Sequence, residues 1–270
     1  MAIKLLFAGC GKMGGAMVAG LLECGHPGGD IIVVEPNPEL AKNLSDQGIV
    51  AVSTPDDLAK SLVPDVVVFA VKPQIMDDVV PAYARFAGPD TVFLSIAAGR
   101  TIAYFEGHLG REAAVVRAMP NTPAAVGRGI SVAVANGAVG KQQAAQCGDL
   151  LAAIGEVAWV DDEGLLDAVT ALSGGGPAYV FLLVECLAEA GLQAGLPEDL
   201  SRKLARATVA GSGELLHLSD DDPATLRHNV TSPGGTTAEA LKVLMEGDGL
   251  QSLLTRAIAA ATARSRQLGG

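Results

Sequence analysis

Short runs of apolar residues alternate with segments of helical spacing along the N-terminal part of the chain. The continuous apolar runs predict strands at residues 3–8, 31–35, 66–71, 91–96, 114–117, 130–135 and 157–160. Apolar positions spaced three and four residues apart predict helices at 13–25, 39–47 and 142–154. Strands that are apolar throughout are typical of a parallel sheet buried on both faces. The order of these elements therefore predicts an α/β fold built on a parallel sheet.

Beyond Asp161 the strand-like runs disappear. Helical spacing covers residues 164–195, 197–217, 236–246 and 249–267, and turns rich in Gly, Pro and Asp separate these segments. We therefore expect an α/β domain over residues 1–161 and an all-helical domain over residues 162–270. The helices carry more Leu, Val and Ala than a lone exposed bundle needs, which predicts that part of their surface is buried between subunits.

A glycine-rich turn follows the first predicted strand and opens the first predicted helix. It matches G-x-G-x-x-G and consists of Gly9, Cys10, Gly11, Lys12, Met13 and Gly14. In Rossmann domains, the first glycine allows the tight turn, the second lets the backbone approach the pyrophosphate, and the third lets the helix pack closely on the strand. The pattern alone is weak, and a chance glycine-rich turn is the alternative. Its place between a strand and a helix favours a Rossmann dinucleotide site.

Glu35 ends the second predicted strand, about 20 residues after the glycines, where this fingerprint has an acidic residue. A carboxylate there accepts hydrogen bonds from the adenosine ribose and repels a 2′-phosphate. No arginine is nearby, and Asn37 is the obvious neutral donor. These residues favour NADH over NADPH. A strand-end carboxylate that simply faces water is the alternative.

The strand at 66–71 ends in a second candidate cofactor contact. Ala70, Val71, Lys72 and Pro73 lie at its carboxyl end, and the carboxyl ends of parallel strands border the ligand crevice. A surface lysine held in a salt bridge is the alternative interpretation of Lys72. We interpret Cys10 as a small residue where bulk would clash, and not as a nucleophile.

Two glycine-rich stretches, at 170–179 and 230–239, interrupt the helical part, although glycine costs about 1 kcal/mol in a helix interior. The second stretch brings hydroxyl groups and bare backbone N–H groups to the start of a helix. That combination suits a carboxylate and needs no arginine. An ordinary turn in which Thr236 or Thr237 caps the helix is the alternative. The donors in this stretch are Ser232, Gly234, Gly235, Thr236 and Thr237.

Composition and charge limit the partners, the cellular compartment and the type of chemistry to be expected. The net charge of −11 argues against nucleic acid as a partner. No uninterrupted apolar stretch is long enough to span a bilayer, and the four cysteines form no CxxC pair, so we expect a cytoplasmic protein with reduced thiols. The chain shows no Ser-His-Asp arrangement, no metal-ligand cluster and no paired carboxylates, which points to hydride transfer by a cofactor.

Several segments resemble the pyrroline-5-carboxylate reductase family, and the resemblance runs over essentially the whole chain. They are Gly9–Gly14, Val71-Lys72-Pro73-Gln74, Met119-Pro120-Asn121-Thr122-Pro123, Leu172–Phe181 and Val230–Leu241, of which the last is the most specific. The resemblance implies a Rossmann domain followed by a helical dimerisation domain. It implies reduction of the cyclic imine 1-pyrroline-5-carboxylate to L-proline with NADPH or NADH, the last step of proline biosynthesis.

The resemblance also implies where the ligands bind. The substrate carboxylate would lie in the 232–237 loop, between one subunit's Rossmann domain and the partner's helices, in dimers that can form larger rings such as decamers. The family often has Glu where this chain has the shorter Asp220, near the substrate amine. Thr170 and Thr237 are candidates for orienting the imine. The further contacts implied are Asn229 for the substrate and Ala97, Ala98, Gly99 and Asn121 for the nicotinamide.

Two alternatives share a Rossmann domain. A β-hydroxyacid dehydrogenase also has helices after it, but needs a catalytic lysine on a helix behind a glycine-rich stretch, and after Gly176 the next lysine is Lys203. A dinucleotide sensor without enzymatic activity needs no second anion site, so the 232–237 loop argues against it.

Overall fold

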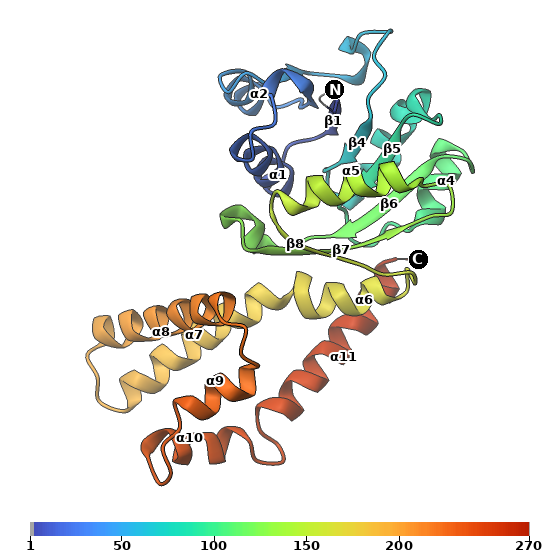
Figure 1. The fold of residues 1–270 in the computed structure, drawn as a ribbon. Coiled ribbons are helices and arrows are strands. Elements are labelled where there is room, and N and C mark those ends of the chain that lie inside the picture. Colours follow the sequence, from blue (N-terminus) through green and yellow to red (C-terminus); the bar gives the residue numbers. More distant parts are fainter. Residues whose placement is uncertain (1–2, 270) are drawn as a thin grey trace. The chain divides into compact units, whose positions relative to one another are not determined.

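The computed structural model describes residues 3–269, and its N-terminal part is built on one eight-stranded sheet (Figure 1). The order of strands is β3-β2-β1-β4-β5-β6-β7-β8. Because the chain order reverses between β1 and β4, the carboxyl ends of these two strands form the switch point where doubly wound sheets bind ligands. The strands are β1 (Leu5–Ala8), β2 (Ile31–Val34), β3 (Val50–Val52), β4 (Val66–Phe69), β5 (Val92–Ser95), β6 (Ala114–Met119), β7 (Gly129–Ala135) and β8 (Gly155–Trp159).

Neighbouring strands run parallel everywhere except at β6 and β7, which are antiparallel. The prediction of a parallel sheet is therefore wrong at one edge, where β7 and β8 run opposite to the other six strands. Its cause is the connection, which holds only the short 3-10 helix Thr122–Val126, whereas a parallel crossover takes about a dozen residues or more. The edge strand β3 was not predicted, because three partly exposed residues leave too little apolar pattern.

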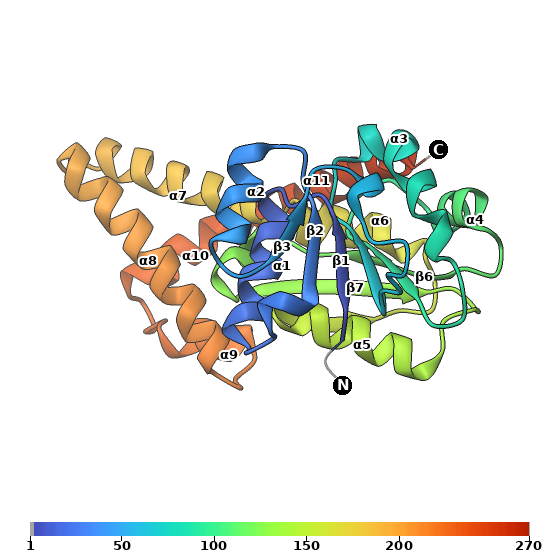
Figure 2. The same cartoon turned by 90° about the horizontal axis from the view of Figure 1, so that it is seen from above.

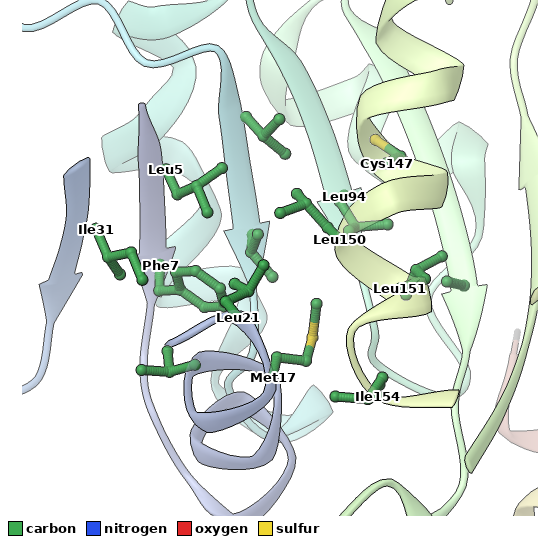
Figure 3. Packing of buried hydrophobic residues seen from close by; sticks show 14 of the residues in the cluster. Leu5, Phe7, Met17, Leu21, Ile31, Leu94, Cys147, Leu150, Leu151 and Ile154 are labelled. Atoms are coloured by element: carbon green, nitrogen blue, oxygen red, sulfur yellow. The ribbon is translucent and has the colours of Figure 1, made fainter. Parts of the chain in front are cut away.

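Helices cover both faces of the sheet. One face packs against α1 (Lys12–Glu23) and α5 (Lys141–Ala152), whose predicted positions are confirmed within one or two residues. Figure 3 shows Met17 of α1 and Leu150 of α5 among the side chains gathered on this face. Helix α2 (Pro38–Ser45) lies beside β3.

The opposite face is packed with aromatic side chains. Phe69 of β4 contacts Tyr83 and Phe105, each with ring centroids 5.5 Å apart. These rings come from the 3-10 helix Val80–Phe86 and from α4 (Ile102–Leu109), which follow the short helix α3 (Met76–Val79). None of the three was predicted, because single turns and an eight-residue helix that contains Gly107 carry little helical periodicity.

The C-terminal part is helical, as predicted. A π-helical turn, Thr170–Gly174, joins α6 to α7, so this first glycine-rich stretch widens a helix rather than ending it. Helix α9 was not predicted, because Pro223 was interpreted as part of a turn that separates two helices. The helices are α6 (Leu165–Val169), α7 (Gly176–Gln193), α8 (Glu198–Leu218), α9 (Pro223–Asn229), α10 (Thr236–Leu244) and α11 (Leu250–Leu268).

Packing divides the chain into two units. The first holds the residues up to Gly174 together with those from Ala261 onward, and the second is Gly175–Ala260. In the second unit, α7 and α8 form an antiparallel pair (Figure 2), and the Ser201 hydroxyl donates to the carbonyl of Ala188 at 2.6 Å. The predicted boundary between residues 161 and 162 concerns folding domains and stays a prediction.

Helix α7 presents an apolar surface. Among the described residues, the helical run Leu165–Gln193 is the one that is long and apolar enough, by length and composition, to cross a membrane. Of the most apolar 18-residue stretch of this run, 6% is buried. Phe181 and Leu182 are more than half exposed. Large exposed apolar side chains are typical of a surface that another protein chain covers.

Close helix packing at Gly20 gives a first prediction. A Cβ at Gly20 would lie 2.3 Å from the carbonyl oxygen of Ala153, at the end of α5. Gly20→Ala should therefore lower the free energy of unfolding by about 1–3 kcal/mol, measured by denaturant titration. Gly107→Ala is the matched control, because that helical position has open space and alanine favours a helix by about 0.5–1 kcal/mol. Equal effects of both variants would contradict the packing described.

Candidate active site

The predicted cofactor residues of the first unit lie together along one edge of the sheet. Each group follows the carboxyl end of a parallel strand, and those strands are neighbours in the order β2-β1-β4-β5-β6. Gly9–Gly14 follow β1, Glu35 follows β2, Ala70–Pro73 follow β4, Ala97–Gly99 follow β5, and Asn121 follows β6. The structure therefore brings them to the edge where such sheets bind their ligands.

The glycine loop lies against the end of β4. Gly9 has φ +81°, and a Cβ there would lie 2.4 Å from Cγ1 of Val71. A Cβ on Gly14 would lie 3.0 Å from Cβ of Ala70 and 3.3 Å from the Gly9 carbonyl oxygen. Both positions are therefore closed to larger residues by the fold itself. Ala70 and Val71 act as the wall against which the loop is packed.

Gly11 differs from its two neighbouring glycines. A Cβ at Gly11 would meet nothing within 4 Å, so no contact inside the protein requires glycine there. It precedes α1, whose first turn holds no acidic residue and leaves N–H groups without helical partners. This open cradle of N–H donors at a helix N-terminus fits the pyrophosphate of a dinucleotide. Lys12 and Met13 lie in that first turn.

Glu35 is 7% exposed, and both of its carboxylate oxygens accept hydrogen bonds from the backbone. Oε2 accepts from the N–H of Cys10 at 3.0 Å, and Oε1 accepts from the N–H of Asn37 at 3.0 Å. The Asn37 Oδ1 caps α2 by accepting from the N–H groups of Glu39 and Leu40. The Asn37 Nδ2 is therefore the donor that this exposed side chain has left for a ligand.

Burial and the neighbouring charge keep Cys10 protonated. Its pKa is raised to about 11, first by burial and then by the negative charge of Glu35. A thiol with this pKa is a poor nucleophile near neutral pH. This agrees with its interpretation as a small loop residue.

Arg100 supports the segment that follows β4. Its Nε and Nη2 donate to the carbonyl of Pro73 at 3.2 and 2.9 Å, and Nη2 pairs with the Asp77 carboxylate at 3.0 Å. Lys72, just before Pro73, is exposed and forms no ion pair within the described residues. Arg100 therefore joins the loops after β4 and β5 and fixes the place from which Lys72 projects.

The loop after β6 is bonded to the π-helical turn. The N–H of Ile130 donates to Asn121 Oδ1 at 2.9 Å, and Asn121 Nδ2 donates to the Ser173 hydroxyl oxygen at 3.2 Å. A Cβ on Gly174 would lie 2.6 Å from Cε of Met119, the flexible end of a side chain that would have to shift to make room. Thr170, on the same turn, donates its hydroxyl to the Leu166 carbonyl at 2.7 Å. The Thr170 oxygen is thus left as an acceptor only.

The second glycine-rich loop lies before α10 in the unit Gly175–Ala260. Gly234 has φ +71°, and the N–H of Gly235 donates to the carbonyl of Ser232 at 3.0 Å, which closes the turn. The helix begins at Thr236 with Gly235 as its N-cap and no side-chain cap. Within the described chain, the exposed hydroxyls of Ser232, Thr236 and Thr237 have no protein partner.

The two other candidate substrate residues lie in the same unit. Asp220 is exposed in the connection between α8 and α9, and Asn229 is the last residue of α9. No cluster of three or more His, Cys, Asp or Glu side chains within residues 3–269 could hold a metal ion.

Comparisons with known proteins cover both parts of the chain. A family model described as pyrroline-5-carboxylate reductase dimerisation matches residues 163–268. A second, described as NADP oxidoreductase coenzyme F420-dependent, matches residues 4–99. A pyrroline-5-carboxylate reductase of Pseudomonas aeruginosa is 39% identical over 266 residues, which is 98% of this chain and 96% of the relative.

The chain belongs to the pyrroline-5-carboxylate reductase family. The family member from Synechocystis is 41% identical over 270 residues, 100% of this chain and 99% of its own. Among solved structures, the pyrroline-5-carboxylate reductase of Coxiella burnetii has a TM-score of 0.94 and 34% identity, and each chain is covered completely. That of Plasmodium falciparum, solved with NADP bound, has a TM-score of 0.82 and 31% identity over 99% of this chain and 98% of its own.

Sequence reasoning about this reductase-family chain missed three supporting side chains. Ser173 was predicted only as part of the segment Leu172–Phe181, and no role was predicted for Arg100. Arg117, 6% exposed in β6, pairs with Glu163 at 2.9 Å, and the same Glu163 oxygen accepts from the N–H of Ile102. An arginine inside the apolar run of β6 is visible in the sequence and indicates a charged partner elsewhere in the chain, because a buried charge needs one.

The open cradle at Gly11 gives the second prediction. Gly11→Val should weaken NADH and NADPH binding by orders of magnitude while the melting temperature stays close to that of the parent, because the side chain fills ligand space and meets no protein atom. Gly14→Val is the comparison variant and should lower the melting temperature, because its side chain meets Ala70 and Gly9. Fluorescence titration and thermal melts measure the two effects. Unchanged dinucleotide binding by Gly11→Val would remove this loop from the cofactor site.

Proposed function

We propose that this chain is an oxidoreductase that reduces 1-pyrroline-5-carboxylate to L-proline with NADPH or NADH, the final step of proline biosynthesis. The observation that carries the proposal is the open cradle at Gly11, at the switch point of the sheet, in a chain of this family. The free hydroxyls of the 232–237 loop supply the second anion site that the substrate needs.

On the cofactor side, the chain provides binding and orientation. The glycine loop and the first turn of α1 hold the pyrophosphate, with Lys12 and Met13 at the helix start. The bound cofactor supplies the hydride, and the protein fixes the orientation of the cofactor relative to the substrate. Asn121 is held by Ile130 and Ser173, so its amide cannot turn freely. We place it, with Ala97, Ala98 and Gly99, beside the nicotinamide.

On the substrate side, neutral hydrogen-bond donors hold the carboxylate. The N–H groups from Gly234 to Thr237 and the hydroxyls of Ser232 and Thr237 serve as donors, and the N-terminus of α10 adds its positive dipole end. Asp220 and Asn229 complete the substrate contacts. The Thr170 hydroxyl donates its hydrogen to the Leu166 carbonyl, so toward a ligand its oxygen can only accept. It therefore orients a protonated imine. Catalysis rests on positioning, because the reaction needs no strong acid or base from the protein.

Turnover assays distinguish this proposal from its two alternatives. The parent protein should oxidise NADPH or NADH only when the cyclic imine is present, and L-proline should form in equal amount. A β-hydroxyacid dehydrogenase would instead turn over hydroxyacids, and a sensor would bind dinucleotide without turnover. Tight dinucleotide binding without any proline formation would refute the proposal.

We propose further that the homo-oligomer is built from dimers, with a decamer as a larger form, and that it acts in the cytoplasm. Helix α7 supports the dimer, because its exposed Phe181 and Leu182 would be covered by a second subunit. The carboxylates of Glu185 and Glu189 on the same helix argue against burial in a bilayer, where charges are expensive. In such a dimer, the 232–237 loop of one subunit would serve the Rossmann unit of its partner.

The assembly can be tested at the α7 surface. Phe181→Glu with Leu182→Glu should shift the protein from a dimer, or a multiple of dimers, to smaller species in sedimentation velocity, because the charges would be buried against the partner. Gln193→Ala, a polar change near the end of the same helix, is the control and should leave the sedimentation profile unchanged. A parent protein that is a fully active monomer would contradict both the dimer and the shared site.

Carboxylate capture can be tested at Thr237. Thr237→Ala should raise the substrate KM about tenfold to a hundredfold, because a hydrogen bond to a charged group contributes about 1.5–3 kcal/mol. Cofactor binding should stay near that of the parent, and inhibition by proline should weaken in parallel with substrate affinity. Thr225→Ala, on α9, is the matched control and should change neither value. Parent-like binding of both substrate and proline by Thr237→Ala would place the anion site elsewhere.

A further inference from the structure

Glu35 has no room to face water. Its side chain lies at the end of β2 with 7% of its surface exposed, and each of its two oxygens accepts a backbone N–H. The N–H donors come from different segments, the glycine loop after β1 and the residues before α2. One carboxylate therefore ties together the two chain segments that flank the adenosine half of a Rossmann site.

The bond to Cys10 is the more important of the two. Cys10 lies between Gly9, which is packed against Val71, and Gly11, which borders the open cradle. The N–H of Gly9 is already held by the Val34 carbonyl at 2.9 Å, and the helical bonds of α1 begin with Gly15 donating to Gly11. Between these two anchors, Glu35 is the group that holds the loop backbone.

A ribose would meet competition at this carboxylate. Two bonds to backbone N–H groups orient both oxygens toward the protein, and the small exposed fraction leaves little carboxylate surface for ribose hydroxyls. Burial is the larger cause of the raised pKa of the Cys10 thiol, and the Glu35 charge, which lies next to the loop, raises it further. A hydrogen bond to a charged acceptor is among the stronger ones in proteins, so its loss should make the glycine loop less rigid.

We propose that Glu35 is a positioning residue that holds the glycine loop in its phosphate-binding conformation, and therefore serves NADH and NADPH equally rather than selecting between them. This inference rests on the proposed function for its cofactors. It differs from the ribose-ligand role in one measurable respect. A ribose ligand changes the ratio of the two affinities, whereas a loop-holding residue changes both affinities together.

The test uses Glu35→Gln in the full-length protein, with Glu23→Gln as the matched control, since Glu23 is an exposed carboxylate at the far end of α1. Two quantities are measured: the Kd values for NADH and NADPH, and amide hydrogen exchange of the peptide that contains Cys10 in the cofactor-free protein. We expect both Kd values to rise about tenfold or more, with their ratio within about twofold of the parent's. Exchange at the loop should accelerate by a similar factor, and the control should match the parent.

A changed affinity ratio with parent-like exchange would overturn the proposal and make Glu35 a ribose ligand. If Glu35→Gln does not fold, Glu35→Asp replaces it, since its carboxylate is one methylene shorter. It should then weaken both cofactors together and speed exchange, and parent-like values would refute the proposal. Hydrogen exchange is read without cofactor, so a parent protein that binds neither dinucleotide would refute the proposed function while the loop-holding role would still be decided.

Discussion

The structure depends on the close approach of the glycine loop to the end of β4. Gly9 and Gly14 leave no space for a Cβ against Val71 and Ala70, and this contact lets α1 begin directly beside the sheet. Because α1 starts there, its unpaired N–H groups point to the switch point between β1 and β4. Gly11 is then the glycine of the motif at which a Cβ would meet no protein atom within 4 Å, so no contact in the fold requires glycine there.

The rest of the first unit supports that edge. Glu35 holds the loop from the β2 side, Arg100 holds Pro73 from the β5 side, and Asn121 is bonded to the π-helical turn. The first two contacts are hydrogen bonds between a side chain and the backbone, and the third joins two side chains. Such bonds fix loops that apolar packing alone leaves free to move. Such positioning serves the proposed hydride transfer, because effective alignment can supply a large part of the rate.

Much of this was predictable from the sequence, and what was missed has physical reasons. The glycine loop, the buried strands and the long helices follow from local pattern, and the structure confirms the Rossmann fold with a helical C-terminal part. The antiparallel β7 was missed because strand direction depends on connection length. The hydrogen bonds of Glu35 and Ser173 were not predicted, because a sequence does not show which backbone N–H a carboxylate reaches, or which amide approaches a hydroxyl. The 232–237 loop was recognised from residue types, and its site role stays a prediction.

In the proposed reaction, this chain positions a nicotinamide for direct hydride transfer to a cyclic imine. The most direct measurement uses NADPH or NADH carrying deuterium at the transferred position of the nicotinamide, with 1-pyrroline-5-carboxylate as substrate, and analyses the product by NMR. Direct transfer predicts L-proline with deuterium on the ring carbon that was double-bonded to nitrogen in the imine. Direct transfer would be contradicted if no proline formed, or if the proline contained no deuterium whichever face of the nicotinamide carried the label.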